Sequence, residues 1–202
     1  MFIENHNNIG YGLHRFSPEE LKPLWDEINA LDHDWTTPTG LVNHKCSLVD
    51  SIPHVEQLVS EQIAEFNWAN NWPNQLRVMD RTAGLKLSQL WVNWMSKHEF
   101  SPIHRHEGVM SFVIWLKVPY TEAEEAAARP YVPEHINYGG QFALHYTDTL
   151  GQLCTKCLPV YTDWESMLCL FPSGINHSVF PYYSSNDLRI SVAGNFVFDP
   201  TV

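Results

Sequence analysis

In the first third of the chain, hydrophobic residues recur at the spacing of an α-helix. Residues 17–20, Ser-Pro-Glu-Glu, have the form of a capping box with proline at the first helical position. Apolar residues follow at intervals of three and four, namely Leu21, Leu24, Ile28 and Leu31. The pattern predicts a helix over about residues 18–31, weakest in its second turn, where Pro23 lacks a backbone donor.

A second apolar stripe with the same period begins after Pro53. Its members are Val55, Leu58, Val59, Ile63 and Phe66. We therefore predict a second helix over about residues 54–69. Residues 36–40, Thr-Thr-Pro-Thr-Gly, lie between the two helices and have the composition of a loop.

From about residue 85 the hydrophobic period changes from 3.6 to 2. Leu85, Leu87, Leu90 and Val92 predict a strand whose alternation slips once, and residues 110–116 predict a second strand. Further strands are expected at residues 141–146, 158–162, 167–171, 178–180 and 188–198. The insertion at residues 120–131 is rich in Glu and Ala, which is typical of a short surface helix or lid.

Gly, Pro, Asn and Asp separate these short strands. Such spacing favours an antiparallel sandwich or barrel over repeated βαβ units. Helices packed against one face of a barrel make an α+β, mainly β fold. No internal repeat or change of composition marks a boundary, so we expect one domain over residues 1–202, with a helical support region at 1–84 and a β core at 85–202.

Composition and charge narrow the range of functions. Of the 202 residues, 44% are hydrophobic, which excludes a disordered chain, and the formal charge of −11 disfavours binding to nucleic acid. We see neither a signal peptide nor an apolar run long enough to span a membrane, so a cytoplasmic protein is expected. The aromatic content of 13% leaves room for an exposed apolar patch and a homodimer.

The four cysteines are expected to be reduced in that compartment. They are Cys46, Cys154, Cys157 and Cys169, and only Cys154 and Cys157 have the spacing of metal ligands. One such pair without a second is a weak zinc signal. The pattern favours a hairpin with two unpaired thiols.

Two histidines stand two residues apart in Ser101-Pro-Ile-His-Arg-His-Glu107, just before the strand at 110–116. In an extended strand His104 and His106 share a face and can bind one metal ion, whereas Glu107 points away. His177, which follows Pro-Ser-Gly-Ile-Asn, is a third candidate ligand. The spacing therefore indicates a metal site.

An iron centre that activates dioxygen keeps open coordination positions, and its usual protein ligands are two histidines and one carboxylate. Here His106 occupies the position two after His104, where a carboxylate is usual. Three arrangements stay open: a site of His104, His106 and His177; a two-histidine site with His106 in a supporting role; or recruitment of Glu107 by a bent backbone. Strand parity favours the first.

Arg189 and Ser191 lie on one face of the strand at 188–198, twelve residues or more after His177. If that face points inward, the buried guanidinium needs a partner, and a ligand carboxylate would bind both side chains. The other interpretation is an exposed Arg189 paired with one of the many acidic residues. Trp91 and Asn93 share a face by parity; either they line the same cavity, with Asn93 donating to a carboxylate, or they are core and turn residues.

Taken together, these motifs resemble the 2-oxoglutarate/Fe(II) oxygenases found in marine bacteria and cyanobacterial phages. The matching segments are His104-x-His106, residues 111–116, residues 170–181 and Arg189-Ile-Ser-Val-Ala-Gly-Asn195, and the match covers about residues 85–198. The resemblance implies a double-stranded β-helix, a jelly-roll or cupin-like barrel, with N-terminal helices packed on the major sheet. It also implies Fe(II) held by His104 and His177, and 2-oxoglutarate as a cosubstrate whose far carboxylate pairs with Arg189 and Ser191.

The implied function is a dioxygenase that hydroxylates a peptide or protein side chain or a small metabolite, coupled to oxidative decarboxylation of 2-oxoglutarate. It would act in the host cytoplasm if a phage encodes the chain. One alternative is a cupin-like three-histidine metal enzyme or binding protein that does not use 2-oxoglutarate. Another is a scaffold that kept the barrel and lost the chemistry. Arg189 distinguishes the dioxygenase from the cupin-like alternative, because a cupin-like site needs no arginine near the metal.

Overall fold

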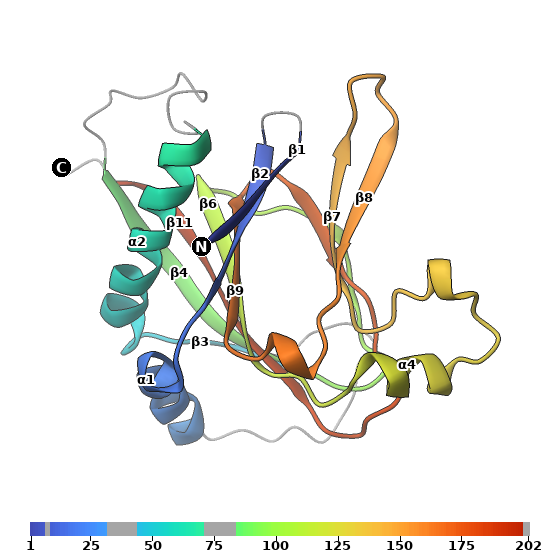
Figure 1. The fold of residues 1–202 in the computed structure, drawn as a ribbon. Coiled ribbons are helices and arrows are strands. Elements are labelled where there is room, and N and C mark those ends of the chain that lie inside the picture. Colours follow the sequence, from blue (N-terminus) through green and yellow to red (C-terminus); the bar gives the residue numbers. More distant parts are fainter. Residues whose placement is uncertain (7–8, 32–43, 71–83, 200–202) are drawn as a thin grey trace.

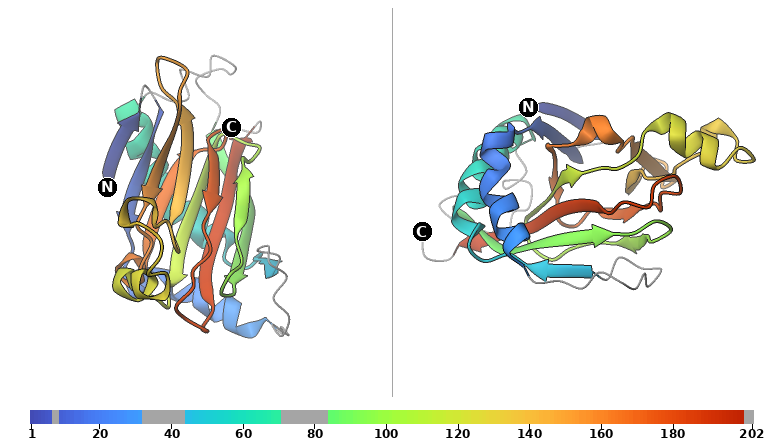
Figure 2. Two further views of the ribbon diagram at one scale, coloured as in Figure 1. Left: turned by 90° about the vertical axis from the view of Figure 1, so that its right-hand side faces the viewer. Right: turned by 90° about the horizontal axis from the view of Figure 1, so that it is seen from below.

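Two antiparallel β-sheets lie face to face, and two helices cover the outer face of the larger sheet (Figures 1 and 2). The computed structural model describes residues 1–6, 9–31, 44–70 and 84–199. The seven-stranded major sheet has the order β1-β2-β9-β6-β11-β4-β3, and the four-stranded minor sheet has the order β5-β10-β7-β8. The expected mainly β fold, with its helices on the major sheet, is confirmed.

The major sheet contains β1 (Phe2–His6), β2 (Ile9–Arg15), β3 (His44–Ser47), β4 (Gly84–Met95), β6 (Met110–Lys117), β9 (Met167–Pro172) and β11 (Arg189–Asp199). The minor sheet contains β5 (Ser101–His104), β7 (Phe142–Thr147), β8 (Leu153–Leu158) and β10 (Asn176–Val179). The helices are α1 (Pro18–Ala30), α2 (Ile52–Asn70) and α4 (Glu122–Ala128), with short 3₁₀ turns η1 (Glu134–Ile136) and η2 (Thr162–Trp164).

Helix α1 begins where the capping box predicts. The backbone N–H of Ser17 donates to the Glu20 carboxylate at 2.7 Å, and the N–H of Glu20 donates to the Ser17 hydroxyl at 3.3 Å. The helix runs through Pro23. The apolar stripe of α1 is buried against the sheet, as predicted, through Leu21, Leu24 and Ile28.

The Glu27 carboxylate ties α1 to the N-terminus of α2. It accepts backbone hydrogen bonds from Val49 at 2.7 Å, Asp50 at 3.1 Å and Ser51 at 2.8 Å. Burial alone would raise the pKa of Glu27, but the hydrogen bonds from Ser51, Val49 and Asp50 outweigh it, and the pKa lies below its ordinary value. A carboxylate at a helix N-terminus is also favourable. The two helices therefore form one support layer.

The major sheet separates two hydrophobic cores. The outer core packs α1 and α2 against side chains such as Val92, Phe112 and Val192. The inner core, between the two sheets, contains Trp115, Phe142 and Phe171. Since strand residues alternate between faces, β6 contributes to both cores.

The slip expected in β4 is a β-bulge at Ser88. Asn195 of β11 pairs with Gln89, and the next residue, Phe196, pairs with Leu87, so Ser88 has no partner in the ladder. The Ser88 hydroxyl donates to the Asn195 carbonyl at 3.0 Å. The bulge keeps the leucines of β4 on the helix side along the whole strand, and Trp91 and Asn93 on the inner side.

Two expectations about secondary structure are wrong. The first third of the chain is not only helical, because residues 2–15 contain the antiparallel pair β1–β2, which extends the major sheet beside β9. The strand expected at 158–162 is instead β8 at 153–158, followed by η2. Pro159 cannot donate to a ladder, and the Thr162 hydroxyl bonds to the carbonyls of Val118 and Tyr120.

Other expectations are met in part. The insertion at 120–131 contains the short helix α4, and the strand expected at 178–180 is β10, two residues earlier. Cys154 and Cys157 lie on β8, in the hairpin that β7 and β8 form, and all four cysteines are free thiols. The loop predicted at 36–40 lies outside the described residues. Within the described part of the chain, no helix is both long and apolar enough to span a membrane.

Candidate active site

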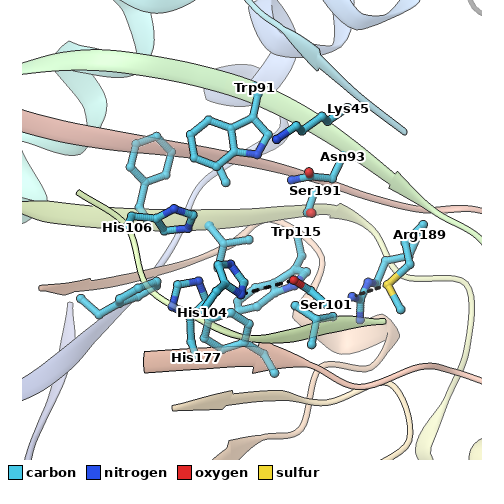
Figure 3. A pocket seen from close by; sticks show the side chains of 17 residues that line it. Lys45, Trp91, Asn93, Ser101, His104, His106, Trp115, His177, Arg189 and Ser191 are labelled. Carbon is cyan, nitrogen blue, oxygen red and sulfur yellow. Dashed lines mark hydrogen bonds between the residues drawn. The ribbon is translucent and has the colours of Figure 1, made fainter. Parts of the chain in front are cut away.

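Three histidines meet at one end of a pocket: His104 and His177 lie on strands, and His106 lies in the loop after β5 (Figure 3). His104 ends β5 and lies directly opposite His177 of β10, so strand pairing alone brings these two together. His106 follows two residues later, and the ligand atoms of the three side chains all lie within 4.8 Å of one another. Among the described residues, this is the group of side chains placed to hold a metal ion.

Two of these histidines are held in the form that can bind a metal. Nδ1 of His104 lies 2.7 Å from the carbonyl oxygen of Pro102, and Nδ1 of His177 lies 3.1 Å from that of Ile175. A carbonyl only accepts, so each Nδ1 carries the hydrogen, which in the neutral ring leaves the lone pair on Nε2. Such contacts fix the tautomer and the orientation of metal-bound imidazoles.

His106 is positioned through its backbone and its neighbours. Its N–H donates to the Ser173 carbonyl at 3.1 Å, and its ring meets the edge of Trp91 at a centroid distance of 5.6 Å. Burial, followed by the charges of His104 and Lys45, lowers the pKa of His106 to about 4. Burial is also the main cause that lowers the pKa of His177, to about 3. The rings of His106 and His177 are therefore neutral near pH 7.

The carboxylate that sequence reasoning left open as a ligand is not in this group. Glu107 is exposed and lies outside the histidine cluster. His145 on β7 is also outside the group, and its ring contacts the hydroxyls of Thr155 at 3.1 Å and Ser178 at 2.8 Å. The cluster therefore offers three nitrogen atoms and no carboxylate.

A cavity of about 280 Å³ runs from the histidines to Arg189 (Figure 3). Its walls carry a few polar groups among aromatic ones, including Trp91, Asn93, Ser101, Trp115 and Ser191. The predicted inward face of β11 and the predicted shared face of Trp91 and Asn93 are both confirmed by this lining. Apolar walls with a few convergent polar groups are typical of small-molecule sites.

Arg189 is a buried cation without a carboxylate partner among the described residues. Only 4% of it is exposed. One guanidinium nitrogen donates to the Tyr120 hydroxyl at 2.8 Å and to the Gly140 carbonyl at 2.9 Å, and the other lies 2.7 Å from the Met95 sulfur. The alternative of an exposed arginine in a surface ion pair is thus wrong. A buried, unneutralised guanidinium on a cavity wall favours an anionic ligand.

Gly140 is needed for this arrangement. Its φ of +72° is a conformation that side chains rarely adopt, and a Cβ added there would meet the Tyr120 ring at 2.3 Å. Only glycine therefore lets this carbonyl approach Tyr120 and Arg189 together. The sequence did not reveal Tyr120 or Gly140 as neighbours of Arg189, because neither lies near Arg189 along the chain.

Strand register explains why the other polar residues face the same cavity. Ser191 pairs with Asn93 of β4 and Trp115 of β6, and Asn93 pairs in turn with Lys45 of β3. These four residues form one row across the inner face of the major sheet, with Lys45 at its edge (Figure 3). Sequence reasoning missed Lys45, since β3 has no hydrophobic alternation that would mark it as a strand.

A cavity between two antiparallel sheets, with histidines that can hold a metal at one end and a buried arginine at the other, fits the iron and 2-oxoglutarate class of oxygenases. A family model described as "Putative 2OG-Fe(II) oxygenase" matches residues 89–195, more than half of the chain. The chain belongs to this family of oxidoreductases, which use Fe(II) and 2-oxoglutarate. The family expected from the sequence motifs is confirmed. No curated protein matches the chain.

Solved structures share the fold at low sequence identity. A 2OG-Fe(II) oxygenase family oxidoreductase from Burkholderia pseudomallei is 16% identical, with a TM-score of 0.55 over 93% of this chain and 85% of that one. A Pseudomonas putida prolyl-4-hydroxylase is 15% identical, with a TM-score of 0.53 over 94% and 92%. A viral collagen prolyl hydroxylase from Paramecium Bursaria Chlorella virus-1 is 12% identical, with a TM-score of 0.51 over 92% and 94%. The expected double-stranded β-helix is confirmed.

Proposed function

We propose that His104, His106 and His177 bind the Fe(II) of this oxygenase, and that Arg189, Ser191 and Asn93 bind the far carboxylate of 2-oxoglutarate. The observation that carries the proposal is Arg189, a buried cation with only neutral partners among the described residues, at the opposite end of the cavity from the histidines. The donor set fits the metal, because neutral imidazoles are iron ligands and three of them leave coordination positions open.

When bound, Fe(II) and 2-oxoglutarate would activate dioxygen, so that one oxygen atom goes into the succinate formed as 2-oxoglutarate loses CO₂, and the other goes into a C–H bond of the substrate as hydroxyl. The protein's part is to bind, orient and exclude water. Pro102 and Ile175 hold His104 and His177 with Nε2 toward the metal position. Arg189 provides a fixed fork for a carboxylate, since Tyr120 and Gly140 already hold one of its nitrogens.

Aromatic side chains close the walls between the two ends of the cavity. Trp115, Phe142 and Phe171 line it and are at most 3% exposed. Excluding water strengthens the attraction between Arg189 and a carboxylate, because the effective dielectric constant is lower. We infer that these residues also keep the oxidant from reacting with solvent.

The substrate we propose is a peptide or protein side chain or a small metabolite, which the enzyme hydroxylates. Support for a peptide comes from the fold alone. A prolyl hydroxylase from Trichoplax adhaerens, solved in complex with a hypoxia inducible factor peptide fragment, is 12% identical with a TM-score of 0.52. A shared fold does not carry a shared substrate, so both classes stay in the proposal.

The test is the anaerobic visible spectrum of the purified protein with Fe(II), before and after addition of 2-oxoglutarate. Chelation of the keto acid to iron should produce a weak charge-transfer band. The same titration on Arg189→Leu should require far more 2-oxoglutarate for the same band. A band that is absent from wild type, although Fe(II) binds, would instead support a cupin-like three-histidine site.

A further inference from the structure

A second cavity of about 480 Å³ adjoins the first. It lies along β3 and β4, and the two cavities share three residues: Lys45, Trp91 and His106. Arg189 lines only the first cavity, whereas Asn195, six residues further along β11, lines only the second. Six strand residues span about 20 Å. A molecule in the second cavity would therefore approach the histidines without crossing the Arg189 end.

The charge around both cavities is opposite to that of the whole chain. The sequence has 23 acidic and 12 basic residues. Among the described residues, however, no aspartate or glutamate lines either cavity, while Lys45 lines both and Arg189 lines the first. Cations in a hollow without acidic neighbours attract an anion, and the acidic remainder of the surface repels it from other sites.

Lys45 is the cation placed to meet such an anion. It is exposed at the edge of the major sheet, in the same row as Asn93 and Ser191, and its side chain lies beside Trp91 (Figure 3). Within the described part of the chain it forms no ion pair, whereas Lys22, Lys86 and Lys117 pair with Asp26, Asp199 and Asp187. No carboxylate among the described residues neutralises its charge.

We propose that the second cavity binds the primary substrate and that Lys45 recognises a carboxylate on it. The remainder of the substrate would lie against Trp91 and against neutral polar groups such as Ser47 and Gln89. The inference rests on the proposed function, since it takes the three histidines as the reaction centre. It adds that the substrate carries negative charge, either as a free small acid or as the acidic side chain of a peptide.

The test measures binding rather than turnover. Anaerobic protein with Fe(II) and saturating 2-oxoglutarate, which occupies the Arg189 end, is titrated by calorimetry with two pairs of probes that differ by one charge. The first pair is the α-amides of N-acetylglutamate and N-acetylglutamine, which carry one negative charge and none. The second is a blocked Gly-Gly-Glu-Gly-Gly peptide and its Gln counterpart. The proteins are wild type, Lys45→Met, Lys45→Glu and the matched control Lys22→Met, which removes one positive charge from α1.

In at least one pair, the charged probe should bind wild type and Lys22→Met about tenfold more tightly than the neutral probe. Lys45→Met should lose this preference, and Lys45→Glu should reverse it. A preference within the first pair identifies a free acid, and one confined to the second pair identifies an acidic peptide. No preference in either pair, or one that survives Lys45→Met, overturns the inference. Failure of the proposed function is separate, since wild type would then lack the charge-transfer band.

Discussion

The two ends of the cavity are built in different ways. At the metal end, each oriented histidine bonds to a carbonyl two residues earlier in its own strand region, His104 to Pro102 and His177 to Ile175. At the anion end, Arg189 is held by Tyr120, Gly140 and Met95, which come from three other segments. The orientation of His104 and His177 therefore depends on local backbone geometry, although β5 must pair with β10 to bring them together, whereas the orientation of Arg189 depends on three distant segments. Mutations should affect the two ends independently.

The largest expected effect is on the metal end. His177→Ala should weaken Fe(II) binding by at least about 100-fold, since loss of a contact that merely supports a ligand already costs up to that much. Anaerobic Fe(II) titration measures it. His135→Ala is the matched control, because His135 is exposed on η1. Equal affinity of wild type and His177→Ala would remove His177 from the ligand set.

At the Arg189 end of the cavity, we expect 2-oxoglutarate binding to be lost and Fe(II) binding to be kept. Arg189→Leu should weaken 2-oxoglutarate binding by about 100-fold or more, because truncating one partner of a buried charge pair costs about 2–5 kcal/mol. Fe(II) affinity should stay within a few-fold of wild type. Removing a buried guanidinium that lacks a carboxylate partner should not lower the melting temperature. A joint loss of iron and 2-oxoglutarate would show that the two ends are coupled.

A smaller loss of 2-oxoglutarate binding is expected from a variant that disturbs the position of Arg189 but keeps its charge. Tyr120→Phe removes the hydroxyl that accepts from Arg189 at 2.8 Å. A hydrogen bond from a charged donor contributes about 1.5–3 kcal/mol, and part of this is kept because Gly140 still holds the same nitrogen, so 2-oxoglutarate should bind about three- to tenfold more weakly. The expected kinetic signature is a higher KM for 2-oxoglutarate with little change in kcat. A drop in kcat alone would assign Tyr120 a different role.

The smallest effect lies outside the cavity, in the helical support layer. Glu27→Gln should cost about 1 kcal/mol of unfolding free energy at pH 7, because a charged cap of α2 is lost. The pKa of Glu27 is lowered in the folded protein, so its contribution is present above the unfolded pKa and disappears as the pH falls through the folded value. The difference in melting temperature between wild type and variant should therefore shrink in acid. Binding of Fe(II) and 2-oxoglutarate should be unchanged at neutral pH.

The features predicted well from sequence are those set by neighbours along the chain. The capping box of α1 and the slip in β4 could be read directly, since both depend on residues within a few positions of one another. The alternation of side chains along a strand also indicated that His104 and His106 share a site, and that Arg189 and Ser191 share a face. Local spacing thus identified the candidate ligands.

The features missed depend on strands that pair across long stretches of chain. Lys45 reaches the cavity only because β3 pairs with β4, and Tyr120 and Gly140 reach Arg189 only after both sheets have formed. Periodicity was also misleading at residues 158–162. There Val160 and Tyr161 are buried against tertiary neighbours, while Pro159 prevents a ladder. A buried segment that pairs with no strand can show the same hydrophobic pattern as a strand.

The bulge at Ser88 determines which side chains of β4 face the helices and which face the cavity. Leu85 and Leu87 before it, and Leu90 and Val92 after it, all face the helices, although their numbers differ in parity. Deleting Ser88 would remove the bulge and leave a regular ladder, in which the same side chains keep their faces. Adding one residue between Leu90 and Trp91 would instead turn Trp91 and Asn93 toward the helical core. The strand should therefore tolerate loss of one residue at the bulge but not a gain of one residue beyond it.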